Sequence, residues 1–324
     1  MCPINMYPIK LKSVYKDYIW GGTKLKEFWN KNSCFKYIAE SWELSCCDAG
    51  LSFIENGILK DKTLRDVLLL FPKWVGENFE STKNFPLLIK LIDAKEKLSI
   101  QVHPSDKLAD KSKNQQGKTE AWYILDCEKD AFLYIGLKEA LTENQIKEYV
   151  ISGTLCEHLN KVFVKPGDIF FISSGTIHAI GSGIVIAEIQ QNSNTTFRLF
   201  DYNRVDSNGN KRELHLEEAL RVCDKTAFSL QNCDIKNLYQ NEDTLIKSLV
   251  NSKFFKIFEY AIKADVSMVS TKKSFQVLLF IDGFAEISFG GQQYEARKGD
   301  CYFIPAGMGE YKVTGTSKFL MSEV

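Results

Sequence analysis

The sequence contains no uncharged apolar run approaching the ~18 residues that a membrane-spanning helix requires. It also has no excess of either charge, because 41 basic residues are matched by 41 acidic ones. The first absence argues against a membrane protein, and the second against binding to nucleic acid or to an anionic membrane surface. The segment Met1 to Met6 lacks the basic region and apolar run of a signal peptide, so we expect a cytoplasmic protein.

Cysteine is present but shows no functional pattern. The nine cysteines are odd in number, scattered along the chain and never spaced as Cys-x-x-Cys. This distribution is typical of reduced thiols in a cytosol. Cys46 and Cys47 are adjacent and can be read as a redox pair, but inert thiols are the simpler interpretation, and no thiol chemistry is expected.

Histidine is scarce, with four in 324 residues and none after His215. His158 lies in a predicted helix and His215 directly precedes another, so both are expected to be ordinary structural residues. A catalytic zinc takes about three protein ligands and keeps one position open, with His and carboxylate as the usual ligands where thiolates are absent. His103, Glu120 and His178 can supply these ligands, although their spacing alone is weak support.

The stretch from Leu98 to Glu120 carries most of these candidate ligands. Side chains alternate along a β-strand, so Leu98, Ile100 and Val102 are predicted to point to one side of a sheet. Gln101 and His103 then share the opposite side. Gln101 is therefore a candidate fourth oxygen donor beside the histidine.

Short apolar segments bounded by Gly, Asn, Asp or Pro follow one another through most of the sequence. Such strands are typical of a sandwich or jelly roll rather than a doubly wound sheet. Helical spacing is limited to Leu64–Leu70, which ends before Pro72, to a stretch within about 139–160 that Ser152 and Gly153 divide, and to 213–222. Because 324 residues is long for a single domain, either two domains or one domain with a large insertion is expected.

An internal repeat supports a two-part architecture. The segment from Lys165 to His178 aligns with the segment from Arg297 to Glu310 at a constant offset of 132, and both contain Gly-Asp, an apolar strand and a glycine turn. A supersecondary unit repeated in this way predicts two similar β-barrels in tandem. In the second copy Glu310 replaces the histidine, so a second metal site on the same plan is not expected.

The first copy resembles the second sequence motif of the cupin superfamily, with Ser173 where proline is usual. Longer motifs resemble those of the short bacterial form of type I mannose-6-phosphate isomerases. The motifs that carry this resemblance are Tyr18 to Gly22, Glu40 to Glu43, Phe85 to Lys90, Gln101 to Asp106, Gly117 to Tyr123, Ser174 to Gly181 and Glu188 to Tyr202.

The resemblance implies a mainly β, tandem cupin fold with a helical insertion in or beside the first barrel. It divides the chain into a catalytic metal-binding domain, 1–235, with the insertion at about 139–160, and a C-terminal domain without a metal site, 236–324. It also implies a zinc-dependent aldose–ketose isomerase that interconverts mannose 6-phosphate and fructose 6-phosphate, with one Zn²⁺ per chain. A monomer or weak homodimer is expected, with a small sugar phosphate as its partner.

The resemblance also implies roles for individual residues. His103, Glu120 and His178 match the zinc ligands of the family, and Gln101 matches a further ligand that some members use. Arg198 matches an active-site arginine. The pocket residues implied are Lys118, which we class as catalytic with Arg198, and Lys90 and Glu188, which we class as substrate-binding. An alternative for Arg198 is a structural ion pair with Asp201 or Glu188.

One departure from the family concerns Cys47. Many relatives have a histidine after the Glu40 to Glu43 motif, and Cys47 occupies that position here. A thiol with a pKa of about 8.5 is mostly protonated at neutral pH, so the proton-transfer base stays unassigned. Two other functions are therefore kept open: a non-catalytic bicupin that binds sugar phosphates, and another metal-dependent cupin enzyme such as an oxygenase.

Overall fold

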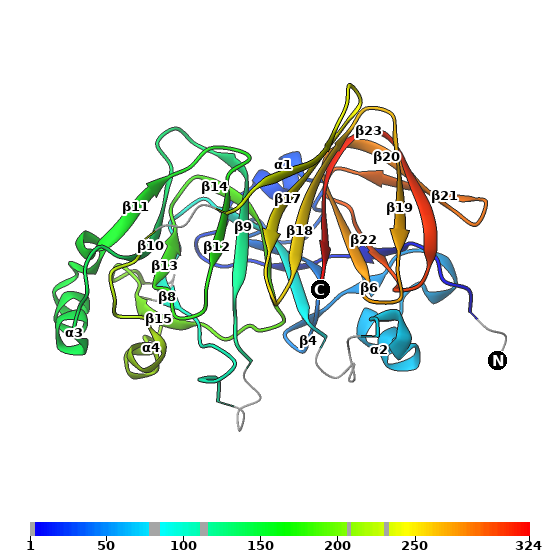
Figure 1. Cartoon of the computed structure of the whole chain (residues 1–324). Coiled ribbons are helices and arrows are strands. Elements are labelled where there is room, and N and C mark those ends of the chain that lie inside the picture. Colours follow the sequence, from blue (N-terminus) through cyan, green and yellow to red (C-terminus); the bar gives the residue numbers. More distant parts are fainter. Residues whose placement is uncertain (1–3, 78–84, 111–115, 206–208, 230–232) are drawn as a thin grey trace.

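The computed structural model describes residues 4–77, 85–110, 116–205, 209–229 and 233–324. Two β-rich halves lie side by side, one formed mainly by the middle of the chain and the other mainly by its C-terminal part (Figure 1). The predicted mainly β architecture with two barrels is confirmed. Within the described residues, none of the helices has the length and apolar character needed to cross a membrane.

The first barrel consists of a six-stranded and a five-stranded antiparallel sheet. In the larger sheet the strand order is β12-β9-β14-β7-β3-β2, and in the smaller one it is β11-β10-β13-β8-β15. The strands of the larger sheet are β2 (Val14–Lys16), β3 (Glu40–Leu44), β7 (Leu87–Ala94), β9 (Glu120–Cys127), β12 (Ile169–Ile172) and β14 (Ile184–Gln191). Those of the smaller sheet are β8 (Ile100–Val102), β10 (Phe132–Leu137), β11 (Leu159–Phe163), β13 (His178–Ile180) and β15 (Phe197–Phe200).

The second barrel is formed by a ten-stranded sheet that also takes in two early strands. Strand β1 (Ile9–Lys12) pairs with both β22 (Cys301–Ile304) and β6 (Phe53–Ile54), so part of the N-terminal segment belongs to the C-terminal sheet. The division after residue 235 stays a prediction. The remaining strands are β16 (Lys236–Gln240), β17 (Thr244–Asn251), β18 (Lys256–Ile262), β19 (Asp265–Ser270), β20 (Gln276–Phe289), β21 (Gln292–Arg297) and β23 (Gly309–Glu323).

The helices are short and lie outside the sheets. Helix α3 (Glu143–Ser152) begins at a capping box formed by Thr142 and Gln145 and ends at Gly153, whose φ of 78° is left-handed. A 3₁₀ turn (Leu155–His158) follows, so the predicted helical segment is indeed divided there. Buried apolar residues of α3 pack in one cluster with those of β10 and β15, which places this element against the smaller sheet. The other helices are α1 (Lys24–Phe28), α2 (Leu64–Leu70) and α4 (Leu216–Val222).

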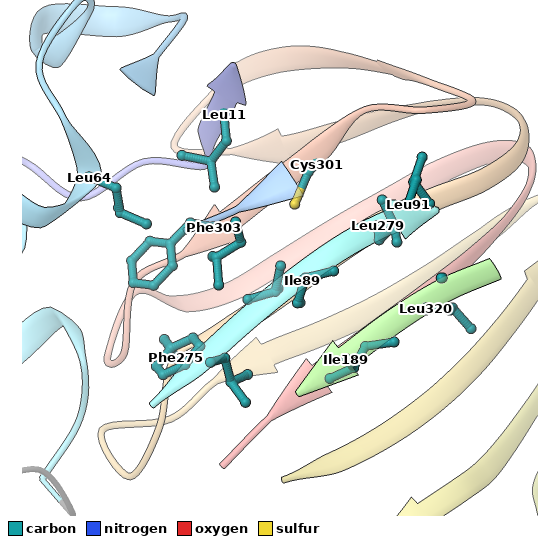
Figure 2. Packing of buried hydrophobic residues seen from close by; sticks show 14 of the residues in the cluster. Leu11, Leu64, Ile89, Leu91, Ile189, Phe275, Leu279, Cys301, Phe303 and Leu320 are labelled. Atoms are coloured by element: carbon teal, nitrogen blue, oxygen red, sulfur yellow. The ribbon is translucent and has the colours of Figure 1, made fainter. Parts of the chain in front are cut away.

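The six-stranded sheet is covered on both faces, because alternate residues of its strands point in opposite directions. On β7, Ile89 and Leu91 join the core between the two barrels, together with Leu279 and Leu320 of the C-terminal sheet (Figure 2). Lys90 lies between them in sequence and therefore faces the interior of the first barrel. Strand β7 is therefore buried on both faces, and Lys90 faces the polar cavity of the first barrel.

The repeat predicted from the sequence has the same backbone geometry in both barrels. Gly167 and Gly299 each have a φ of 93°, a left-handed conformation that favours glycine. The next residue, Asp168 or Asp300, accepts a 2.9 Å hydrogen bond from the backbone N–H three positions earlier. Each turn leads into a four-residue strand, β12 or β22, at the same offset of 132. The two copies are therefore equivalent in structure.

The interior of the second barrel differs from that of the first in its chemistry. The buried apolar and aromatic side chains that pack in its interior include Phe280, Phe319 and Tyr302. Glu310, which aligns with His178, is exposed. Among the described residues, the one group of potential metal ligands lies in the first barrel, and the absence of a site in the second barrel stays a prediction.

The core between the barrels predicts a stability test. Replacing the fully buried Ile89 by Ala should lower the free energy of unfolding by about 2–5 kcal/mol, because it removes apolar contacts and leaves a cavity. The matched control is Ile151→Ala on α3, where the side chain is 82% exposed and a change within about 0.5 kcal/mol is expected. Chemical denaturation measures both, and equal losses would contradict this description of the core.

Candidate active site

Three potential metal ligands meet inside the first barrel. His103 follows β8, Glu120 begins β9 and His178 begins β13, and their ligand atoms all lie within 4.8 Å of one another. Glu120 Oε1 lies 3.3 Å from His178 Nε2, and Glu120 Oε2 lies 3.6 Å from His103 Nε2. All three side chains are at most 1% exposed. The structure therefore brings together the three residues that the sequence proposed as ligands.

Backbone carbonyls orient both imidazole rings. Nδ1 of His103 lies 2.9 Å from the Thr195 carbonyl oxygen, and Nδ1 of His178 lies 2.9 Å from that of Thr176. A carbonyl oxygen only accepts, so each Nδ1 carries the proton and each Nε2 presents a lone pair toward Glu120. This is the arrangement by which proteins fix metal-binding histidines.

Burial keeps these histidines neutral. It is the main reason that the pKa of His103 lies well below its usual value, and the nearby Lys118 ammonium adds to the effect. Burial also lowers the pKa of His178 to about 4. Both rings are therefore uncharged at neutral pH, the state in which an imidazole binds a metal.

The Glu120 carboxylate is fully buried and incompletely partnered. Its Oε1 has no hydrogen-bond partner among the described residues, while Oε2 lies 2.6 Å from Lys118 Nζ. Burial raises the pKa of Glu120, against the opposing effect of the Lys118 charge. A carboxylate oxygen left without a donor between two imidazole lone pairs fits a divalent cation at this point.

Gln101 borders the same centre from β8. The side-chain Nε2 of Gln101 lies 3.3 Å from His178 Nε2. Gln101 and His178 are also opposite one another in the pairing of β8 with β13. The amide nitrogen has no available lone pair, so the atom of Gln101 that can ligate a metal is Oε1.

A row of charged and aromatic residues crosses the inner face of the six-stranded sheet. Lys90 is paired in register with Trp42 on one side and Glu188 on the other, and Glu188 is paired with Trp122. Lys90 Nζ lies 3.2 Å from Glu188 and 3.6 Å from Glu40. Trp122 donates to Glu188 at 3.0 Å. Glu40, whose motif the sequence marked without giving it a role, is therefore part of this row.

The row alternates in charge as it approaches the metal centre. Lys118 Nζ lies 3.9 Å from Glu188 and also contacts Glu120, so it links the row to the centre. Burial alone would raise the pKa of Glu188, but the ammonium groups of Lys118 and Lys90 outweigh it and hold that pKa below its usual range. Burial opposes the charge of Lys90, yet Glu40 and Glu188 keep its pKa above the usual value.

A cavity of about 270 Å³ opens beside this row. Lys90, Gln101, Lys118, Glu188 and Arg198 all line it, so the structure gathers the remaining predicted pocket residues around one space. The volume is close to the lower end for small-molecule sites, about 300 Å³, and polar groups dominate its walls.

Arg212 also lines the cavity, and sequence reasoning missed it. It follows Arg198 by fourteen residues, and no motif marked it. Arg212 donates to both oxygens of Asp201, at 2.7 and 2.5 Å, and Arg204 donates to the same carboxylate. Arg204 and Arg212 therefore make the ion pair with Asp201 that the sequence suggested for Arg198. Arg198 donates instead to the Glu213 carbonyl at 2.6 Å.

The motif from Tyr18 to Gly22 forms a turn at the cavity wall and ends in isolated β-bridges from Gly21 to Ala94 and from Gly22 to Ile38. Tyr18 and Trp20 line the cavity. Glycine is needed at position 22 because a Cβ atom there would lie 2.4 Å from an Asp93 carboxylate oxygen. That oxygen accepts from the Lys24 N–H at 2.8 Å at the start of α1, which holds the turn in place.

Cys47 is not among the residues that line the cavity. It belongs to a small hairpin of β4 (Cys46–Cys47) and β5 (Gly50–Leu51), and Cys46 packs into the core between the barrels. The Cys47 thiol is therefore not part of the cavity wall as the structure describes it.

A larger cavity of about 800 Å³ lies elsewhere, between the two barrels. Its walls include Ser173, Thr176, Asp224 and Asn251, but none of the three clustered potential metal ligands. Size alone would favour this cavity, whereas the buried charges and the ligand cluster favour the smaller one as the site of chemistry.

Comparison with known proteins finds two family models that match this chain. Residues 9–147 match the model for "Phosphomannose isomerase type I, catalytic domain", and residues 245–324 match that for "Mannose-6-phosphate isomerase, cupin domain". The first match contains His103, Glu120 and Lys118.

Two relatives from Bacillus subtilis (strain 168) match over nearly the whole chain. "Probable mannose-6-phosphate isomerase GmuF" is 37% identical over 98% of this chain and 99% of its own length. "Mannose-6-phosphate isomerase ManA" is 36% identical over the same shares. The crystal structure of a mannose 6-phosphate isomerase from Bacillus subtilis superposes with a TM-score of 0.91 at 33% identity, covering 98% of this chain and 99% of that one.

The candidate metal centre predicts the effect of removing one ligand. His178→Ala should weaken divalent metal binding by more than the roughly 10–100-fold that loss of an outer partner costs, because an inner ligand is removed. Metal content after dialysis, measured by atomic emission, should fall accordingly. His158→Ala is the control, since His158 stacks on Tyr149 with ring centroids 3.7 Å apart, outside the centre. Undiminished metal content in His178→Ala would contradict the assignment.

Proposed function

The chain belongs to the type I phosphomannose isomerase family, and we propose that it interconverts D-mannose 6-phosphate and D-fructose 6-phosphate at the centre formed by His103, Glu120 and His178. Family membership supports this reaction over a non-catalytic sugar-phosphate-binding role. The observation that carries the proposal is a buried, incompletely partnered Glu120 facing two neutral imidazoles, next to a cavity lined by cationic side chains.

The reaction moves a proton between C1 and C2 of the sugar through an enediol. The site must polarise a sugar oxygen, stabilise the negative charge that develops, and bind the substrate phosphate. A divalent cation bound here, for which we propose one Zn²⁺ per chain, would supply Lewis acidity. His103, Glu120 and His178 would hold it, with Gln101 Oε1 as a further ligand.

We assign Lys118 a catalytic role. Its Nζ lies 2.6 Å from Glu120, 3.1 Å from His103 Nε2 and beside the cavity, so it can donate to a sugar oxygen held at the centre. The developing enediolate is negative, and a fixed ammonium in a buried site stabilises such a charge more strongly than solvent does.

Lys90 and Glu188 are assigned to substrate binding. Both are buried, both line the cavity, and the Trp122 N–H and the neighbouring carboxylates and ammonium groups hold them in place. A rigid pair of one donor and one acceptor suits the hydroxyl groups of a sugar. Because the pKa of Glu188 is held low, its carboxylate remains an acceptor at neutral pH.

Arg198 and Arg212 give the cavity its capacity for an anionic substrate. Asp201 is the carboxylate that pairs with Arg212, and Arg204 shares it, so positive charge is in excess at this side of the cavity. Guanidinium groups bind phosphate oxygens with well-directed hydrogen bonds. This excess favours a phosphorylated sugar over a neutral one.

The proposed reaction is tested by assaying the metal-depleted chain after adding zinc, cobalt or manganese separately. Mannose 6-phosphate should yield fructose 6-phosphate, measured in a coupled assay, and chelation should abolish the yield. Unphosphorylated mannose should react far more slowly. Tight calorimetric binding of the sugar phosphate without turnover under all three metals would overturn the isomerase proposal in favour of a binding protein.

A second prediction concerns Arg198. Arg198→Ala should keep its metal but lower kcat/KM by about 100-fold or more, the usual effect of losing a donor to developing charge or phosphate. Arg198→Lys should recover little, because lysine lacks the forked donors. The matched control is Arg65→Ala, since Arg65 pairs with Asp48 at the surface. Full activity in Arg198→Ala would contradict the pocket assignment.

A further inference from the structure

Arg198 lies on a sheet edge that no strand covers among the described residues. Strand β15 is the last strand of the five-stranded sheet and pairs on one side with β8, where Gln101 is opposite Arg198. On the other side, the backbone of Arg198 is bonded to residues that directly precede α4. The segment Glu213 to His215 takes the place of a strand at this point.

Three hydrogen bonds join this segment to Arg198. The His215 N–H donates to the Arg198 carbonyl at 2.8 Å, and the Arg198 N–H donates to His215 Nδ1 at 3.1 Å. The Arg198 guanidinium donates through Nη1 to the Glu213 carbonyl at 2.6 Å. The second bond depends on the imidazole side chain, which replaces the carbonyl that a neighbouring strand would have offered.

The His215 side chain has no role in capping α4. The first-turn N–H of Ala219 bonds to the His215 carbonyl, which every residue possesses, and the imidazole makes no capping bond. Helix α4 is anchored separately, because its buried Ala219, Leu220 and Val222 pack in the same cluster as Phe197 and Leu199 of β15. Replacing the imidazole should therefore leave the helix in place.

Anchoring one end of the guanidinium leaves other donors for the cavity. Nη1 is used by Glu213, whereas the buried Nε of Arg198 has no hydrogen-bond partner among the described residues. A buried donor without a partner is costly unless something binds it. The orientation of β15 at residue 198 thus decides whether these donors point at a bound anion.

We propose that His215 is a positioning residue for Arg198 and that its Nδ1 sets the direction in which the guanidinium meets the negative charge of the substrate. The inference rests on the proposed function, because it deepens the role of Arg198 there. His215 touches neither the metal centre nor, through its side chain, the substrate cavity. Its imidazole also packs edge-on against Phe197, so only an effect that is lost in an Arg198→Ala background can be assigned to the positioning of Arg198.

The test compares three replacements of His215. In His215→Asn, Oδ1 stands the same number of bonds from Cα as Nδ1 and can accept from the Arg198 N–H. In His215→Gln the acceptor is one bond farther, and in His215→Ala it is missing. We expect kcat/KM to fall about 10–100-fold in the Ala and Gln variants, as for a small misplacement of a reacting group. In the Asn variant kcat/KM should stay much closer to that of the unaltered chain.

Three further measurements separate positioning from general damage. Metal content should be unchanged in all three variants, and the thermal midpoints of the Asn and Gln variants should be alike. In an Arg198→Ala background, His215→Ala should add little to the loss, because both changes remove the same contribution. His158→Ala serves as the unaffected histidine control.

The proposal is overturned if His215→Ala matches the unaltered chain, if Asn is as impaired as Ala or Gln, or if the losses add fully in the double variant. If His215→Ala does not fold, the comparison of Asn with Gln decides the question. If the unaltered chain shows no isomerisation, the proposed function fails on its own. Calorimetric affinity for fructose 6-phosphate across the same variants then still tests whether His215 positions Arg198.

Discussion

The alternation of side chains along the six-stranded sheet is the constraint on which the rest of the structure depends. Because β7, β9 and β14 are covered on both faces, every residue in their central parts must suit a buried environment. One set of alternate residues forms the apolar core between the barrels, and the other carries charged groups into the first barrel. A shift of one residue in any strand would exchange these sets and bury unpaired charge against the second barrel.

The buried charges are tolerated because positive and negative side chains alternate along the inner face of the sheet. From Glu40 the row runs through Lys90, Glu188 and Lys118 to Glu120, with neighbouring groups 2.6 to 3.9 Å apart. The row ends at Glu120, where two neutral imidazoles converge. The same row that would destabilise an apolar core thus favours a cation at its end, and a bound cation would in turn favour an anionic substrate.

The second barrel contains the same repeated turn and strand as the first but, in the part of the chain that the structure describes, lacks the row of buried charged residues. Gly299 and Asp300 reproduce the turn of Gly167 and Asp168, yet the strands that follow enclose phenylalanine and tyrosine side chains instead of polar groups. Its sheet supplies the apolar surface that covers the outer face of β7 and β14. The C-terminal half therefore contributes to the site indirectly, by holding rigid the strands from which Lys90 and Glu188 project.

Features set by local sequence were predictable. The helix Leu64–Leu70 was predicted with its observed bounds, Gly153 divides the helical segment as expected, and the repeat offset held in the backbone. The environment of Lys90 did not follow from the sequence, because a lysine inside an apolar strand can either extend to water or face a polar cavity. At Tyr18 to Gly22 the structure has a turn followed by isolated β-bridges from Gly21 to Ala94 and from Gly22 to Ile38, and such a long-range pairing is not visible in local sequence.

By itself, the sequence determined the β architecture, the tandem repeat and the candidate residues His103, Glu120, His178 and Arg198. Only the tertiary structure shows that Arg212 lines the cavity and that Cys47 does not. It also shows the hydrogen bond between His215 and Arg198. Periodicity and motifs report interactions between residues close in the chain. These three placements depend instead on which distant segments pack against the edge of β15 and around the cavity. Only the packing of the complete chain decides which segments these are.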